Sequence, residues 1–201
     1  MVVAVSGSGR SLENLLKQQS KYAYRVCGVI SSKANCNGVL IAKDAGLRVY
    51  CEDFSGGVFA SDALLTWLIE VKAYWIALAG FVKQFPVSFP GNMSLRQRII
   101  NIHPSIIPSF SGKGMYGMRV HKAVECAQVR ESGATIHFVD GGYDTGAIIS
   151  QIKTKLIPGQ NAELIAKQVF ADELVLYPDT LSALVKKQLP LKDGTIYMYN
   201  K

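Results

Sequence analysis

Paired cysteines, a long apolar run and a basic leader are all missing from this chain of 201 residues. The four cysteines have no Cys-x-x-Cys spacing, which argues against a disulfide framework or a zinc site; Cys27 and Cys51 lie in apolar runs and are expected to be buried free thiols. No apolar run reaches the ~18 residues that a membrane-spanning helix needs. The first residues predict a buried strand rather than a signal peptide, so we expect a cytoplasmic location.

Basic residues outnumber acidic residues by 22 to 15, which gives a formal net charge of +7. This excess suits an anionic ligand such as a phosphate ester or a polyglutamylated cofactor. The basic residues are scattered, and no basic run is interleaved with aromatic residues, so nucleic acid is not an expected partner. Hydrophobic residues make up 49% of the sequence, which is typical of a globular chain.

Apolar runs alternate with helical patterns through the first half of the chain. The expected strands cover residues 2–6, 25–31, 47–51, 74–79 and 98–103, and the expected helices cover 11–19, 37–45 and 61–72. Near-continuous apolar strands separated by helices are typical of a parallel sheet covered on both faces. We therefore predict an α/β fold with one doubly wound, mostly parallel, Rossmann-like sheet in a single domain of residues 1–201.

The second half predicts an antiparallel edge for that sheet. Strand-like runs at residues 134–139 and 148–156 are separated by a short loop and are expected to pair as antiparallel neighbours. A helical pattern covers residues 161–187, and Pro178 is expected to break or kink it. Residues 194–198 predict a small terminal strand.

Two motifs bear most directly on chemistry: Asn-Ile-His-Pro at residues 101–104 and Tyr-Asp-Thr-Gly at residues 143–146. Asn101 and His103 stand two positions apart on a strand and so point to the same face. If Asp144 joins them, an amide donor, an imidazole and a carboxylate form a set suited to acyl transfer through a tetrahedral intermediate. In the alternative interpretation, Asn101 and His103 only form hydrogen bonds with loop backbone groups, and Asp144 is a turn residue.

The segment Ser-Gly-Ser-Gly-Arg-Ser at residues 6–11 lies between the first strand and the first helix. Its glycines allow close backbone approach, and free N–H groups at a helix start favour an anion. It is not a Walker P-loop, and Leu12 replaces the last glycine of a dinucleotide-binding motif. Arg10 and Ser11 favour phosphate binding, although plain turn chemistry also explains the glycines.

Several other residues have more than one interpretation. His137 has no evident partner along the sequence, which favours a structural histidine, and His121 is expected at a helix start on the rim. Glu173 lies on an apolar helix, so its charge either reaches solvent or meets a ligand cation. The glycine-rich residues 112–118 form either a gating loop or a flexible connection.

The run at residues 101–114, with Ala-Gly-Phe at 79–81 before it and the motif at 143–146 after it, closely resembles the phosphoribosylglycinamide formyltransferases (glycinamide ribonucleotide transformylases). These are folate-dependent formyltransferases of purine biosynthesis, and the likeness extends from Val2 to about Pro178. The resemblance implies an enzyme that transfers the formyl group of 10-formyltetrahydrofolate to the amine of phosphoribosylglycinamide, without a metal. We expect residues 1–100 to form a phosphate-binding half and residues 101–201 a catalytic and folate-loop half.

The resemblance also implies roles for individual residues. Asn101 would stabilise the oxyanion, His103 would assist and protonate the departing folate nitrogen, and Asp144 would pair with His103 and raise its pKa. The acceptor phosphate would lie on Gly9, Arg10 and Ser11, and the rest of the acceptor on Gly80, Pro104 and Glu173. The folate would contact Val82, Lys83, Gln84, Phe85, Val139, Asp140 and Gly141.

The chain departs from the family pattern at three places. Gly9-Arg10-Ser11 stands where Gly-Ser/Thr-Asn is usual, Val82-Lys83 stands where Met-Arg is frequent, and residues 53–66 contain no arginine. We hypothesise that Arg10 takes over part of the anion contact. Three alternatives stay open: a formyltetrahydrofolate deformylase, a formyltransferase acting on another amine, and a silent ligand-binding module. The two small-molecule substrates are the expected partners, and the sequence is compatible with a monomer or a homodimer.

Overall fold

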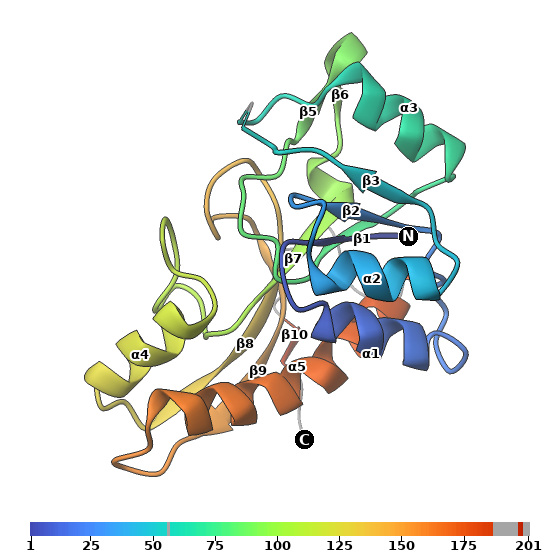
Figure 1. The fold of residues 1–201 in the computed structure, drawn as a ribbon. Helices are drawn as coiled ribbons and strands as arrows, with labels where there is room; N and C mark the ends of the chain where they lie inside the picture. Colours follow the sequence, from blue (N-terminus) through green and yellow to red (C-terminus); the bar gives the residue numbers. More distant parts are fainter. Residues whose placement is uncertain (56, 187–196, 199–201) are drawn as a thin grey trace.

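The structure, a computed structural model, describes residues 1–55, 57–186 and 197–198 (Figure 1). The strands are β1 (Val2–Val5), β2 (Gly28–Ser31), β3 (Val49–Cys51), β4 (Ile76–Leu78), β5 (Ser88–Phe89), β6 (Met93–Ser94), β7 (Ile99–His103), β8 (Glu131–Phe138), β9 (Ile148–Lys155) and β10 (Tyr197–Met198). The α-helices are α1 (Arg10–Gln18), α2 (Asn37–Asp44), α3 (Asp62–Glu70), α4 (Met118–Cys126) and α5 (Ala162–Val185). Two short 3₁₀ turns, η1 (Pro90–Asn92) and η2 (Arg96–Arg98), precede β6 and β7.

Eight of the described strands form one sheet in the order β10-β9-β8-β7-β4-β1-β2-β3. Within this sheet, the neighbouring strands β3, β2, β1, β4 and β7 are parallel to one another. Strand β8 runs antiparallel to both β7 and β9. The predicted doubly wound sheet with an antiparallel edge is therefore confirmed. β5 and β6 form a separate two-stranded hairpin that the sequence patterns did not reveal.

The two faces of the sheet belong to two different cores, because side chains alternate along each strand. From β1, Val3 and Val5 pack with α1, α2, α4 and α5 on one face. Val2 and Ala4 pack on the other face with α3 and the segment leading to β5. Figure 1 shows α1, α2 and α5 together on one side of the sheet and α3 on the other. Helices thus cover both faces, as expected.

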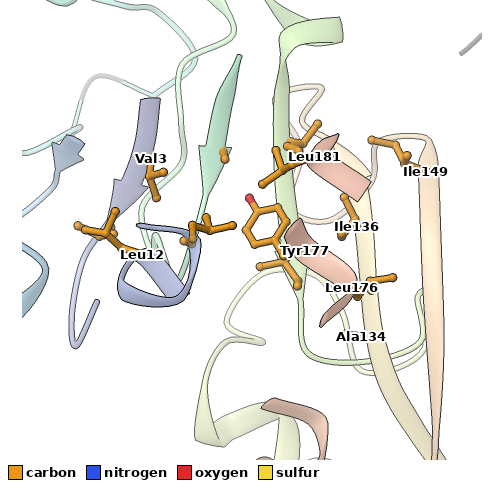
Figure 2. Packing of buried hydrophobic residues seen from close by; sticks show 14 of the residues in the cluster. Val3, Leu12, Ala134, Ile136, Ile149, Leu176, Tyr177 and Leu181 are labelled. Carbon is orange, nitrogen blue, oxygen red and sulfur yellow. The ribbon is translucent and has the colours of Figure 1, made fainter. Parts of the chain in front are cut away.

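Helix α5 crosses the first of these cores. Figure 2 shows its Tyr177 and Leu181 among side chains of the central sheet, between Leu12 of α1 and Ile136 of β8. The hydroxyl of Tyr177 donates a 2.9 Å hydrogen bond to the carbonyl oxygen of Leu78, at the end of β4. This bond connects α5 to the strand end next to the site described below.

Helix α5 runs without interruption through Pro178, so of the predicted break or kink, the break is wrong. Proline has no N–H, so the carbonyl of Leu174, four residues earlier, loses its helical donor. The side chain of Asn14 on α1 replaces that donor, with Nδ2 at 2.9 Å from the Leu174 oxygen. A contact between residues 160 positions apart therefore lets the helix continue.

Most other differences concern element ends and exposure. Strands β2, β3 and β4 are shorter than predicted, and β8 begins at Glu131, earlier than the apolar run suggested. Cys51 is exposed and Cys27 half-buried, so the expectation of two buried thiols was wrong, although all four cysteines are free. The described part of the predicted terminal strand is β10, which pairs parallel to β9; residues 187 and 194–196 lie outside the described residues. In the part of the chain that the structure describes, no helix is both long and apolar enough to cross a membrane.

Candidate active site

A cavity of about 470 Å³ lies at the carboxyl ends of β1, β4 and β7. The strand order puts β2 on one side of β1 and β4 on the other, so the winding direction of the chain reverses here. Open α/β sheets bind their ligands at such a switch point. The backbone N–H of Val82, after β4, donates to the hydroxyl of Ser6, after β1, over 3.1 Å and ties the two strand ends together.

Asn101 and Asp144 meet in this cavity together with a third residue, His137. Asn101 on β7 is directly opposite His137 on β8 in the antiparallel ladder, so both side chains point to one face. The Asn101 Nδ2 atom lies 3.1 Å from Nε2 of His137 and 3.4 Å from Oδ1 of Asp144. The Nδ1 atom of His137 lies 2.8 Å from the Phe138 carbonyl oxygen and donates to it, which leaves Nε2 as an acceptor for Asn101 in the neutral ring.

His103 completes the group from the end of β7, where it is 3% exposed. Its Nε2 atom lies 2.9 Å from the carbonyl oxygen of Phe110 and donates a proton to it. Its Nδ1 atom lies 3.3 Å from Oδ2 of Asp144, a contact that is a hydrogen bond only when this nitrogen is also protonated. Burial lowers the pKa of His103, and this effect outweighs the opposing effect of the Asp144 charge. The expected pairing is therefore present, but the expected net rise in pKa is not.

Asp144 accepts hydrogen bonds from several directions. Burial alone would raise its pKa, but the neighbouring His137, the charge of His103 and the backbone N–H of Gly112 together lower it. The Gly112 nitrogen donates to Oδ2 over 3.0 Å, so the ionised carboxylate also anchors the start of the loop at residues 112–118. Asp144 has a positive φ of 57°. A β-carbon at Gly146 would lie 1.8 Å from the Phe138 carbonyl oxygen, so only glycine allows this loop to return so close to β8.

Two histidines differ from expectation. His137 had no evident partner in the sequence and was expected to be a structural histidine, but it accepts a hydrogen bond from Asn101 and contacts Asp144 in the cavity. Its position depends on the pairing of β7 with β8, which a single apolar run does not specify. His121 was predicted on the rim, but it is 6% exposed on α4 and lines the cavity. Its Nδ1 atom has no hydrogen-bond partner among the described residues. Burial, with a smaller contribution from the charge of His103, lowers the pKa of His121 to about 4.

The first turn of α1 forms the opposite end of the cavity. Gly9 has a left-handed φ of 71°, and a β-carbon there would lie 2.6 Å from the Cα atom of Gly38, so this glycine has a packing role and does not line the cavity. Arg10 and Ser11 do line it. The N-cap residue of α1 is Gly9, and no side chain caps this end of the helix. Backbone N–H groups of the first turn are therefore free for an anion.

Glu173 reaches the same end of the cavity from α5. It is partly exposed there, and burial raises the pKa of its carboxyl to about 8, against the opposing charge of Arg10. At neutral pH the carboxyl is therefore largely protonated and both donates and accepts hydrogen bonds. The side chain of Glu173 therefore faces a ligand space, and its contact with a ligand cation stays a prediction.

The predicted folate residues surround a third side of the cavity. Val82, Lys83, Gln84, Phe85 and Val139 line it, whereas Asp140 and Gly141 do not. Gln84 donates to the carbonyl of Gly141 and so connects the segment after β4 to the loop before Asp144. Lys83 forms a 3.2 Å ion pair with Asp53 at the surface. Gly80 and Pro104 also line the cavity.

The sequence of this chain identifies its protein family. The chain matches the family described as formyl transferase over residues 1–181. The chain belongs to the formyl transferase family. It is 35% identical to the chloroplastic phosphoribosylglycinamide formyltransferase of Vigna unguiculata, over 96% of this chain and 64% of that protein. It is 33% identical to the protein of the same name from Arabidopsis thaliana, over 100% of this chain and 70% of that protein.

Solved structures agree with this assignment. The crystal structure of phosphoribosylglycinamide formyltransferase from Anaplasma phagocytophilum matches with a TM-score of 0.83 at 29% identity, and the match covers 99% of this chain and 98% of that one. The described residues contain no group of three or more histidine, cysteine or acidic side chains placed to hold a metal ion. The polar side chains that line the cavity include Asn101, His103, His121, His137, Asp144 and Glu173.

Proposed function

We propose that the protein transfers the formyl group of 10-formyltetrahydrofolate to the amine of phosphoribosylglycinamide, a step of de novo purine biosynthesis. The observation that carries this proposal is the convergence of Asn101, His103 and Asp144 in the cavity that also reaches the first turn of α1. Membership of the family and the names of the relatives support the same reaction. The cytoplasmic location, the two functional halves and the oligomeric state remain predictions.

The reaction needs a hydrogen-bond donor that stabilises negative charge on the formyl oxygen. The acceptor amine attacks the formyl carbon, and the developing oxyanion takes a hydrogen bond from Nδ2 of Asn101. In the free protein this amide donates to His137 and Asp144, so the formyl oxygen replaces one of these partners. The 3.4 Å contact with Asp144 is the longer one and is the bond we expect to be exchanged.

The reaction also needs a proton for the departing folate nitrogen. The amine loses one proton and the folate nitrogen gains one, so the enzyme has only to carry a proton from the first nitrogen to the second. His103 would take up the amine proton on its Nδ1 atom, which faces Asp144 and is unprotonated in the neutral ring, and would then pass that proton to the leaving nitrogen. Asp144 stabilises the imidazolium during this relay, because its own pKa is low and it stays ionised.

The acceptor is proposed to lie between the reacting group and the first turn of α1. Its phosphate would rest on the backbone of Ser11 and on the side chain of Arg10. The largely protonated carboxyl of Glu173 would accept or donate a hydrogen bond at the glycinamide amino end and would not capture it as an ammonium ion. A neutral amine is the form that can attack.

The pterin is proposed to pack against Val82, Phe85 and Val139, which form an apolar side of the cavity. The ring of Phe85 packs against the rings of Phe54 and Phe81, with centroids 5.5 and 5.4 Å away. This packed aromatic cluster gives the folate side of the cavity a rigid wall. The +7 net charge suits the carboxylates of the folate tail.

The test is formation of the folate product, followed by absorbance, with and without phosphoribosylglycinamide. Product that requires the acceptor is the expected result. Equal product formation without acceptor would replace the proposal with hydrolysis by water, the deformylase reaction. Product formation only with a different amine would retain the chemistry and change the acceptor, and no product under any of these conditions would favour a ligand-binding role.

A further inference from the structure

Arg10 stands over an aromatic ring inside the cavity. The central carbon of its guanidinium lies 4.2 Å from the ring centroid of Phe170, a half-buried residue of α5. Both side chains line the cavity, and Arg10 is the first residue of α1. The contact therefore joins the first turn of α1 to α5 across the proposed phosphate end.

The guanidinium has no other fixed partner among the described residues. No described carboxylate lies within salt-bridge distance of it. Glu173, nearly one helical turn after Phe170, is close enough to sense its charge, yet its carboxyl is largely protonated at neutral pH. Arg10 is thus a cation that the protein holds in place without neutralising it.

A guanidinium held over a ring has a specific use. The ring covers one face of its plane, and the N–H groups at its edge stay available to an anion. The contact also restricts a long side chain before the ligand arrives, which reduces the entropy lost on binding. Lysine cannot reproduce this arrangement, because an ammonium group has no flat edge with two parallel donors.

We infer that Phe170 is a positioning residue for acceptor recognition: its ring holds Arg10 beside the first turn of α1, where the guanidinium edge binds a phosphate monoester. The inference rests on the proposed function, since it assigns the phosphate of the acceptor to Arg10. It adds a residue of α5 that acts on specificity only through Arg10. Phe170 should therefore matter for phosphorylated acceptors and lose its effect when Arg10 is absent.

Steady-state kinetics on the full chain tests this dependence. The variants are Arg10→Ala, Phe170→Leu, Phe170→Tyr and the double variant Arg10→Ala/Phe170→Leu, each assayed with phosphoribosylglycinamide and with its dephosphorylated nucleoside. For the phosphorylated acceptor we expect KM to rise about 10–100-fold in Arg10→Ala, the loss of a charged hydrogen-bond pair. Phe170→Leu should raise it about 3–10-fold, and Phe170→Tyr should restore it to within about 2-fold.

The pattern across variants separates a positioning role from a packing role. The double variant should have the KM of Arg10→Ala alone, the kcat and the folate KM should stay unchanged, and the nucleoside should show no difference between variants. Multiplying effects in the double variant, an equal rise in KM for the nucleoside, or an unchanged KM in Phe170→Leu would each overturn the inference. Thermal unfolding of each variant checks that the fold is retained.

A second measurement does not depend on turnover. Calorimetric titration with inorganic phosphate should give a Kd about 3–10-fold weaker for Phe170→Leu than for the unmodified protein, and equal affinities would contradict the inference. If the unmodified protein fails to formylate phosphoribosylglycinamide, the proposed function falls while this titration still decides the role of Phe170. The matched control is Tyr74→Leu: Arg98 lies over that ring at 4.4 Å, neither residue lines the cavity, and no change in KM or Kd is expected.

Discussion

His137 fixes the direction of the amide that we propose as the oxyanion donor. One N–H of Asn101 is donated to the His137 Nε2 atom, and the His137 Nδ1 atom is itself held by the Phe138 carbonyl. Without this support the amide is free to rotate, and its two ends differ in chemistry: one donates and the other accepts. The histidine that the sequence suggested was structural thus supports a reacting group.

Replacing that histidine should therefore slow the chemical step. His137→Leu is expected to lower kcat about 10-fold, the value of roughly one hydrogen bond, with the acceptor KM changed less than about 3-fold. His137→Gln keeps an acceptor for the amide and should recover part of kcat. Measured kcat and KM for both variants test this, and a change confined to KM would show that His137 acts on binding instead.

Buried His121 should make the protein sensitive to acid. Its pKa of about 4 in the folded state lies below the ordinary value of 6.5, so between these pH values the unfolded state binds more protons. The free energy of unfolding is then highest above pH 6.5 and decreases as the pH falls towards 4. The shift corresponds to at most about 3 kcal/mol.

The variant His121→Phe removes this titration and keeps a ring of similar size. Urea unfolding at several pH values between 4 and 7 should show a shallower loss of stability in the variant than in the unmodified protein. Parallel curves for the two proteins would mean that His121 is not the group responsible.

At the scale of elements, α5 depends on a neighbouring helix to pass through Pro178. Asn14 supplies the donor that the proline cannot, so Asn14→Ala should lower the free energy of unfolding by about 1–2 kcal/mol. In a Pro178→Ala background the Leu174 carbonyl regains an N–H from residue 178, and the same substitution should then cost less than about 0.5 kcal/mol. Chemical denaturation of the four proteins gives the coupling, and equal costs in both backgrounds would contradict this explanation.

The same contact explains why part of the fold was not predictable. Apolar runs and helical periodicity identified the parallel strands and α1, α2 and α3, because those signals are local. The continuity of α5 at Pro178 depends on Asn14, far away in the sequence. The two-residue strands β5 and β6 are too short for any periodicity, and their pairing is apparent only in three dimensions.

In the candidate site, too, some residues have a local sequence signal, whereas others are recognisable only from long-range contacts. Asn101 and His103 were recognisable because they share one strand end, and Asp144 because of its glycine-bounded motif. His137 required the register of β7 against β8, which places it opposite Asn101. Phe170 looked like any apolar helix residue until its contact with Arg10 was visible.

At the scale of the whole molecule, net charge and sheet topology act on the same substrates. We propose that the anionic ligands bind at the switch point between β1 and β4, and the +7 charge should raise their local concentration. Salt shortens the range of this attraction. We expect kcat/KM for the phosphorylated acceptor to fall roughly 3–10-fold between 20 and 200 mM salt, with kcat unchanged.

The dephosphorylated nucleoside serves as the control for this salt effect. Its kcat/KM should change little over the same range, because it lacks the anionic group. An equal fall for both acceptors would indicate that salt acts on the folate or on the protein, and no fall for either would remove long-range attraction from the explanation.

The reacting centre itself is tested most directly by the single-turnover rate of formyl transfer in Asn101→Ala. If the Asn101 amide holds the oxyanion, this rate should fall about 10²–10³-fold, while thermal stability and the affinity for the acceptor stay close to those of the unmodified protein. A rate within about 3-fold of the unmodified protein would show that the formyl oxygen is stabilised elsewhere and would contradict the central claim.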